Sequence, residues 1–195
     1  GLAAAFALLG GAVWAAHSSA MAILPVPEPL TGSQPYATLL CKFSDVAAEP
    51  LTPSYFNRMM FDGPDSLDQY WRRVSYGKID LSGSRAFGWF AMPGPRDAYR
   101  LAGPDHGNLE ALARDCSAVA DPVVDFRQFV GVNLVLNDCI HRPRGGEMAL
   151  TLDGERRRYR MTWLCPGVSA AHQIVAHEIG HSFGLTHSSD WTGHE

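Results

Sequence analysis

The eleven residues His177–His187, HEIGHSFGLTH, constrain the fold of this chain more than any other segment. They follow the pattern H-E-x-x-H-x-x-G-x-x-H. Positions four apart on a helix lie one turn above each other, so His177 and His181 would present two imidazoles on one face. Gly184 can adopt a positive φ, which predicts that the helix ends there and that the chain turns back toward this face. His187 would then supply a third imidazole.

Three imidazole nitrogens form a common ligand set for zinc. With His177, His181 and His187 as ligands, a tetrahedral ion keeps one open position, which is typical of catalytic rather than structural zinc sites. Glu178 lies beside these ligands, and a carboxylate there can accept and return a proton without binding the metal. A bare H-E-x-x-H occurs by chance on many helices, but the longer pattern is far rarer. We therefore predict Zn²⁺ as the cofactor and Glu178 as the general base.

This longer pattern resembles the signature of the metzincins, zinc endopeptidases with a methionine-containing turn beneath the metal. A second segment, Tyr70–Gly83 with the sequence YWRRVSYGKIDLSG, is followed by Gly88–Phe90. Both are similar to a region of the secreted immune inhibitor A-like and gametolysin-like metalloproteases. The resemblance implies an α+β, zincin-like fold with a twisted mixed sheet and an active-site helix. It also implies a secreted endopeptidase that acts on extracellular proteins or peptides.

The resemblance extends over residues 36–195, which we expect to form the catalytic domain. No methionine follows Met161, so we expect the methionine-containing turn to follow Glu195 in a longer chain. A chain of 195 residues that is 46% hydrophobic can bury one good core but not two full enzymatic domains. One domain is therefore expected.

The first 35 residues differ in composition from the rest. The segment Leu2–Ala16 carries no charge and is rich in alanine and leucine, which is typical of the apolar region of a signal peptide. Ala20–Ala22 fits the small-x-small cleavage pattern, so residues 1–22 are predicted to be a signal peptide whose start is missing. The alternative is an uncleaved membrane anchor, although the apolar run is short for a bilayer span. Residues 23–35 are proline-rich, which predicts an extended linker or pro-segment remnant.

The four cysteines fit an exported protein with two disulfides, because none of them has the C-x-x-C spacing of a thiolate metal site. Three pairings of Cys41, Cys116, Cys139 and Cys165 are possible, and the sequence does not choose among them. A bond between Cys139 and Cys165 would tie the loop before the active-site helix to the preceding strand. Buried free thiols are the alternative.

Charge argues against a nucleic-acid partner. The formal net charge is −4, whereas proteins that bind nucleic acid usually carry a basic stripe. The basic run Arg156–Arg158 follows Asp153 and Gly154, and we interpret it as part of a solvated hairpin turn.

Short apolar runs and the alternation of polar and apolar residues predict the strands. A buried strand is expected at Ala37–Phe43, a half-buried one at Lys78–Leu81, and another at Val130–Leu136. The runs Met148–Leu152 and Tyr159–Leu164 flank a turn and predict a hairpin. An extended substrate can pair with the outer strand of a zincin sheet through main-chain hydrogen bonds. The sequence does not identify that strand.

Helices are predicted from caps and apolar spacing. Ser66 and Gln69 form a capping box, and the apolar positions that follow at helical spacing are expected to face inward: Leu67, Tyr70, Trp71 and Val74. A second helix is expected at Asn108–Val119.

The active-site helix is expected to begin with Ser169 as its N-cap and to run to about Phe183. Ala176, Ile179 and Phe183 would then pack against the sheet while the ligand histidines face the cleft. His172 lies off the ligand face, so we predict a surface or supporting role for it rather than metal binding.

Other functions compete with proteolysis. A zinc-binding pseudoenzyme or a secreted adhesion or binding module would keep the fold without hydrolysis, although neither requires a glutamate at position 178. A zinc hydrolase acting on glycans or non-peptide amides would share the same metal chemistry.

Overall fold

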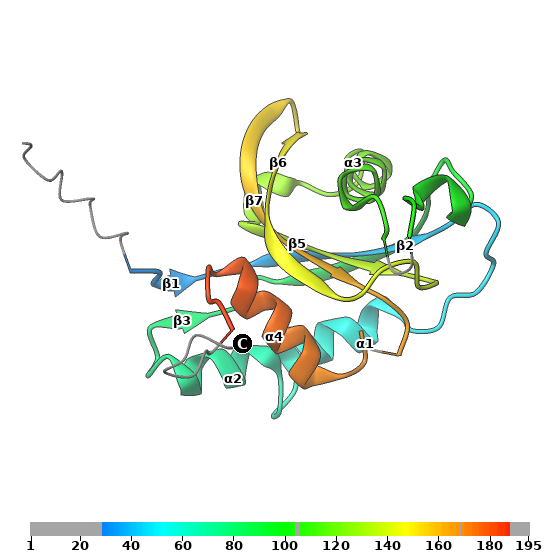
Figure 1. Cartoon of the computed structure of the whole chain (residues 1–195). Coiled ribbons are helices and arrows are strands. Elements are labelled where there is room, and N and C mark those ends of the chain that lie inside the picture. Colours follow the sequence, from blue (N-terminus) through cyan, green and yellow to red (C-terminus); the bar gives the residue numbers. More distant parts are fainter. Residues whose placement is uncertain (1–28, 104–105, 168, 188–195) are drawn as a thin grey trace, which may run out of the picture.

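A five-stranded sheet separates two layers of helices in the computed structural model of the chain, which describes residues 29–103, 106–167 and 169–187 (Figure 1). From one edge to the other, the strand order is β4 (Arg85–Ala91), β2 (Tyr36–Lys42), β5 (Gly131–Leu136), β7 (Glu155–Leu164) and β6 (Arg144–Leu152). The first four strands run parallel, and β6 pairs antiparallel with β7 at the edge. The α+β class and the mixed sheet are therefore confirmed.

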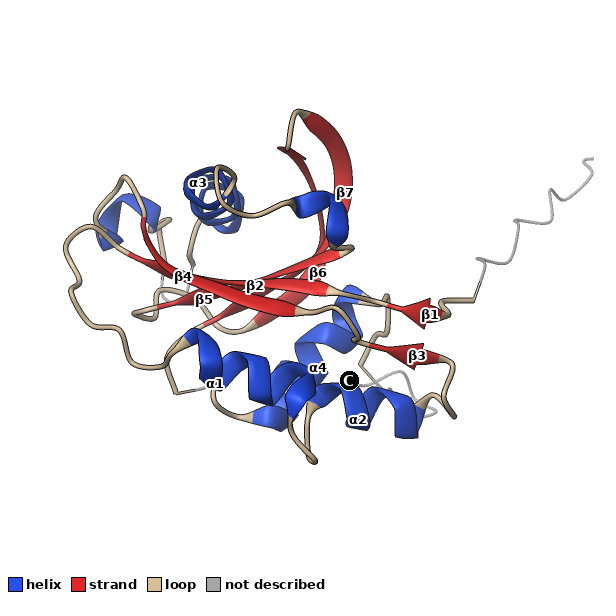
Figure 2. Ribbon diagram, turned by 180° about the vertical axis from the view of Figure 1, so that it is seen from behind, coloured by secondary structure: helices blue, strands red, loops and turns tan. Residues whose placement is uncertain are grey.

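The helices cover both faces of this sheet. Helix α3 (Leu109–Ala120) lies on one face, and the other face carries α1 (Pro53–Asn57), α2 (Leu67–Val74) and α4 (His172–Ser182) (Figure 2). Three short segments are irregularly helical: η1 (Arg58–Asp62), η2 (Arg96–Tyr99) and η3 (Phe126–Gln128). A separate two-stranded parallel pair is formed by β1 (Gly32–Ser33) and β3 (Ile79–Asp80).

Central strands β2 and β5 carry the core. All six residues of β5 and the first six of β2 are buried, as expected for parallel strands covered on both faces. A polar link crosses these apolar strands: Asn133 donates to the Thr38 hydroxyl at 3.0 Å, and the Thr162 hydroxyl donates to Asn133 at 2.7 Å. Because each of these buried polar groups has a partner, the link joins three neighbouring strands without leaving an unsatisfied group.

The predicted strands are found with changed lengths. Those expected at Ala37–Phe43 and Val130–Leu136 are confirmed as β2 and β5. The hairpin is confirmed as well, with longer arms that meet at Asp153 and Gly154, whose φ angles of 50° and 76° are typical of a tight hairpin turn. The strand expected at Lys78–Leu81 is reduced to the two residues of β3.

The basic run lies on a strand and not in a turn. Arg156–Arg158 belongs to β7, one residue after the turn. Arg156 and Arg158 are exposed, as expected, but the partly buried Arg157 donates to the carbonyl oxygens of Phe126 and Phe129. The prediction of a fully solvated turn was therefore wrong for Arg157, because its guanidinium caps the end of η3.

Helix α2 begins at its predicted N-cap, but fewer of its residues are buried than predicted. The Ser66 hydroxyl accepts a hydrogen bond from the Gln69 amide at 3.4 Å, and Leu67 and Trp71 are buried. Tyr70 and Val74 are 39% and 46% exposed, so their predicted inward position was wrong. The helix lies at the surface, and only its central stripe meets the core. Helix α3 also has its predicted start, with Asn108 as the N-cap.

Helix α4 starts later than predicted. Its N-cap is Ala171, which makes no side-chain capping bond, and its first residue is His172. Ser169 is buried in the preceding turn, where its amide donates to the carbonyl of Cys165 at 2.9 Å. Its prediction as the N-cap was wrong, because this turn delays the start of the helix.

Two disulfides cross-link the domain. Cys41–Cys116 links β2 to α3, and Cys139–Cys165 links the segment before β6 to the segment after β7. Disulfides are typical of proteins in an oxidising environment. None of the helices in the described residues has the length and apolar character needed to span a membrane.

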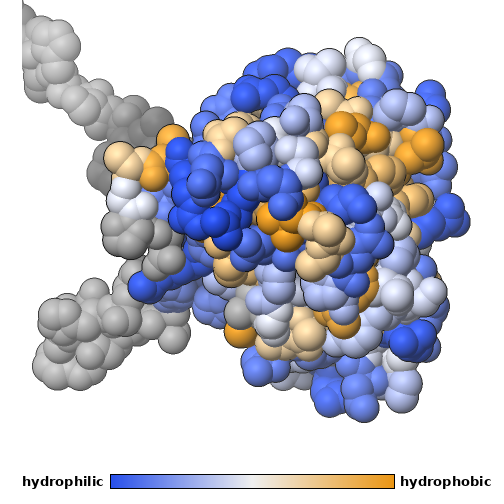
Figure 3. All heavy atoms as spheres, turned by 90° about the vertical axis from the view of Figure 1, so that its right-hand side faces the viewer, coloured by the Kyte–Doolittle hydropathy of each residue, from blue (hydrophilic) through white to orange (hydrophobic). Residues whose placement is uncertain are grey.

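One face of the surface can be followed in Figure 3, which shows the side on the right of Figure 1. Hydrophobic residues form several separate groups there, with hydrophilic residues between them. Scattered groups of this kind are normal for a folded protein and do not by themselves indicate a binding site.

Candidate metal centre

Helix α4 fixes two histidines by packing its opposite side. Val175, Ala176 and Ile179 are buried with the residues of the sheet and of α2, and Phe183 packs against the same cluster. The predicted inward face is therefore confirmed. His177 and His181 lie one turn apart on the other side of the helix, where His177 is exposed and His181 is half-buried.

The turn after α4 brings in the third histidine. Gly184 has a φ of 87°; its amide donates to the His181 carbonyl at 2.9 Å, and the amide of Leu185 donates to the Gly180 carbonyl at 3.0 Å. This pair of bonds is the Schellman arrangement, which ends a helix with a residue in the left-handed conformation. The chain reverses there and returns His187 to the helix face, as the sequence predicted.

The three imidazoles converge on one point. Nε2 of His181 lies 3.0 Å from Nε2 of His177 and 3.0 Å from Nε2 of His187. One candidate ligand atom from each of the three histidines lies within 4.8 Å of the other two. Nitrogens about 2.0–2.1 Å from a tetrahedral zinc ion are about 3.3 Å apart. The observed separations therefore fit a common metal ion.

Hydrogen bonding supports this fit. Nδ1 of His181 lies 2.8 Å from the Leu185 carbonyl oxygen, which can only accept, so Nδ1 carries the proton. The Nε2 of a neutral His181 then has a free lone pair that faces two other imidazole nitrogens. A single proton can bridge only one of these two contacts, whereas a cation between the rings satisfies all three nitrogens. A backbone carbonyl that orients a ligand histidine in this way is common around protein metal sites.

Glu178 lies on α4 next to the ligand histidines and is only 6% exposed. Burial raises the pKa of its carboxyl group above the ordinary value, although the nearby guanidinium of Arg144 acts in the opposite direction. A buried carboxylate with a raised pKa is a stronger base than an exposed one. The position and the basicity of Glu178 therefore suit a group that accepts a proton.

The first residues of β6 form the other wall of the site. Pro143, Arg144 and Gly145 line a hollow of about 270 Å³ together with the ligand histidines and Glu178. A Cβ atom on Gly145 would lie 1.9 Å from the Glu178 carbonyl oxygen, so strand and helix touch here through their backbones. Neither Arg144 nor Gly145 was predicted to belong to the site. The only signal in the sequence was the pair Gly145–Gly146 just before the predicted hairpin.

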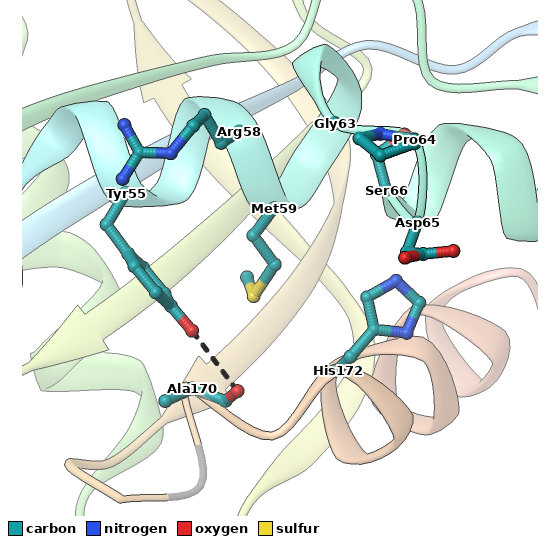
Figure 4. Close-up of a pocket in the computed structure, with 9 residues that line it drawn as sticks. All are labelled: Tyr55, Arg58, Met59, Gly63, Pro64, Asp65, Ser66, Ala170 and His172. Atoms are coloured by element: carbon teal, nitrogen blue, oxygen red, sulfur yellow. Dashed lines mark hydrogen bonds between the residues drawn. The ribbon is translucent and has the colours of Figure 1, made fainter.

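His172 does not join the metal centre. It lines a separate hollow of about 360 Å³ at the start of α4, where Figure 4 shows its ring next to the Asp65 side chain. In the same hollow, the Tyr55 hydroxyl donates to the Ala170 carbonyl at 3.3 Å. Nε2 of His172 is buried without a hydrogen-bond partner among the described residues. Its predicted supporting role remains a prediction, and it is absent from the histidine cluster that the described residues form.

Some predictions concern parts of the chain outside the described residues. These are the signal peptide at residues 1–22, the first six residues of the predicted linker, 23–28, and the methionine-containing turn expected after Glu195. Comparisons with models of protein families and with curated proteins found no match.

Proposed function

We propose that this protein is a secreted zinc-dependent endopeptidase with a zincin-like catalytic domain. The convergence of the three Nε2 atoms of His177, His181 and His187 beside the buried Glu178 is the observation that carries the proposal. The two disulfides support an extracellular location. The parallel sheet with one antiparallel edge strand supports the resemblance to the metzincins.

Each residue of the site has a part in peptide hydrolysis. The three imidazoles would hold zinc, which lowers the pKa of a water molecule to about 7 and polarises a carbonyl group. Glu178 accepts the proton of the attacking water and then donates it to the nitrogen of the leaving amine. His181 is held in its metal-binding tautomer by the Leu185 carbonyl. Because Glu178 is largely buried, bulk water competes little for this proton.

Strand β6 supplies a place for the substrate backbone. It is one of the two edge strands, it pairs only with β7 among the described strands, and its first residues border the metal centre, whereas β4 forms the opposite edge. The main-chain groups on its outer side can form hydrogen bonds with an extended peptide. Such pairing would hold many different sequences next to Glu178, which suits an endopeptidase. In this proposal, β6 is the outer strand that the sequence left open.

A casein assay with and without a chelator tests the proposal. The purified protein should cleave casein, lose activity with 1,10-phenanthroline, and regain it when zinc is added. Glu178→Gln should retain zinc, because Glu178 is not a ligand, and should lose at least about 100-fold in rate, at the lower end of what general base catalysis contributes. A protein that binds zinc and cleaves neither casein nor peptides would instead be a pseudoenzyme or binding module. A protein without any bound metal would contradict the proposal altogether.

A further inference from the structure

Arg144 stands between two hollows. It lines the hollow of the metal centre and also a neighbouring hollow of about 390 Å³. Its position is fixed by the residue that follows it, because Gly145 is in backbone contact with Glu178. Adjacent Cα atoms are about 3.8 Å apart, so the long side chain of Arg144 starts next to the contact between Gly145 and Glu178.

The neighbouring hollow has a mainly uncharged lining. Leu101 and Leu109 supply apolar surface, and the floor is close-packed, since a Cβ atom on Gly107 would lie 3.2 Å from His141. His141 is buried, and burial together with the charge of Arg144 lowers the pKa of its ring. The ring is therefore neutral at physiological pH. His106 completes the lining.

The two hollows contain an arginine that has no carboxylate partner among the described residues. Glu178 is the only carboxylate among the described residues that line either of them. Arg144 is exposed, and no carboxylate in the described part of the chain lies within ion-pair distance of it. Its guanidinium can therefore form a two-pronged hydrogen bond with an incoming carboxylate, a geometry that arginine favours. Apolar neighbours such as Leu101 and Leu109 reduce solvent screening and strengthen such a pair.

We infer that Arg144 and the hollow beside it form a subsite for a substrate carboxylate, so that peptides with an acidic group close to the scissile bond are preferred. This inference rests on the proposed peptidase function and adds a substrate class to it. The carboxylate can come from an Asp or Glu side chain or from the C-terminus of the substrate. Because Arg144 is exposed and solvent screens part of the attraction, we expect a preference of no more than about ten-fold from the two-pronged pair.

Matched peptides measure this preference. One set of amidated fluorogenic peptides carries Asp or the uncharged isostere Asn at each of the three positions on either side of the cleaved bond. A second set of Asn peptides differs only in a free or amidated C-terminus. We expect kcat/KM to be about ten-fold higher for the acidic member of at least one pair. The set in which the preference appears identifies the source of the carboxylate.

Variants of Arg144 test the assignment. Arg144→Ala should reduce the acidic preference, measured as the ratio of kcat/KM within each acidic and neutral pair, to less than about three-fold, while the zinc content stays within about two-fold. Because Arg144 also lowers the pKa of Glu178, the rates for both members of a pair should change, and only their ratio tests the subsite. Arg144→Lys should restore part of the preference, and Arg144→Glu should favour Lys over Asp at the same position. Arg156→Ala is the matched control, because Arg156 is an exposed arginine on the same hairpin outside both hollows. The control should keep the full preference.

A binding measurement separates this inference from the proposed function. Fluorescence anisotropy of labelled Asp and Asn peptides is measured with zinc-loaded Glu178→Gln and with the unaltered protein. Tighter binding of the Asp peptide that depends on Arg144, without any hydrolysis, would support the subsite and reject the peptidase. Chelator-sensitive cleavage with equal rates for every acidic and neutral pair would support the peptidase and overturn the subsite. An acidic preference that survives in Arg144→Ala would overturn it as well.

Discussion

The two ends of helix α4 carry histidines with different surroundings. His172, in the first turn, lines a hollow without any other histidine and has its ring edge-on to Tyr70, with centroids 6.2 Å apart. His181, in the last turn, meets two further imidazoles at 3.0 Å and is oriented by the carbonyl of Leu185. Both residues belong to the same helix, so the difference comes from the segments that pack around each end. A ligand set forms only where the chain turns back and where a strand closes the other side.

The largest expected effect is a difference in zinc binding between variants of these two histidines. His181→Ala removes the central ligand, so zinc affinity should fall by more than about 100-fold and proteolysis should be lost. His172→Ala should leave the zinc content and the affinity within about two-fold. Metal analysis after gel filtration and competition with a chromogenic chelator measure both variants. If His172→Ala also lost its zinc, the contrast between the two ends would be wrong.

The contact of α4 with β6 is tested by two neighbouring glycines. Gly145→Ala places a methyl group 1.9 Å from the Glu178 carbonyl oxygen, so the strand must move away from the helix. We expect a loss of about 2 kcal/mol or more in the free energy of unfolding and a strong loss of activity.

Gly146→Ala is the matched control, because no atom lies within 4 Å of its added Cβ. Its stability should remain within about 0.5 kcal/mol of the unaltered protein. Urea unfolding followed by tryptophan fluorescence compares the two variants. Equal stabilities would mean that the backbone contact at Gly145 does not define the site.

The turn at the end of α4 should make a smaller contribution. Gly184 has a φ of 87° with open space around its Cβ position, so Gly184→Ala introduces backbone strain without a clash. We expect a loss of about 1 kcal/mol in stability and a moderate weakening of zinc binding, because His187 depends on this turn. Thermal unfolding with and without zinc measures both effects. An unchanged zinc affinity would show that the position of His187 does not depend on the turn.

The smallest expected effect concerns pH. Burial lowers the pKa of His141 in the folded protein below its unfolded value of about 6.5. The unfolded chain therefore binds a proton first, and the contribution of this residue to stability is complete above about pH 6.5 and is lost as the pH falls toward the folded pKa. Unfolding at about pH 7.5 and about pH 5.5 should show a weaker pH dependence for His141→Phe than for the unaltered protein. An equal change in the free energy of unfolding between the two pH values for both proteins would contradict this expectation.

Regular local patterns made much of the fold predictable. The buried runs of β2 and β5, the hairpin turn at Asp153, and the caps Ser66 and Asn108 all depend on residues close together in the sequence. The start of α4 was mispredicted because the turn that delays it involves Cys165, which is held by a disulfide to a distant residue. Helix α1 and strand β4 were not predicted from their residues; β4 is only partly buried, and its pairing with β2 shifts register between Leu40 and Cys41.

By itself, the sequence determined the spacing of the three histidines and the glycine turn between them, since both depend only on helix periodicity and local backbone conformation. Only the tertiary structure decided that Arg144 and Gly145 form the facing wall of the metal centre and that β6 lies at an edge of the sheet. The facing wall depends on a contact between segments far apart in the sequence, and the edge position depends on the order of the strands. No local sequence pattern encodes the facing wall or the edge position.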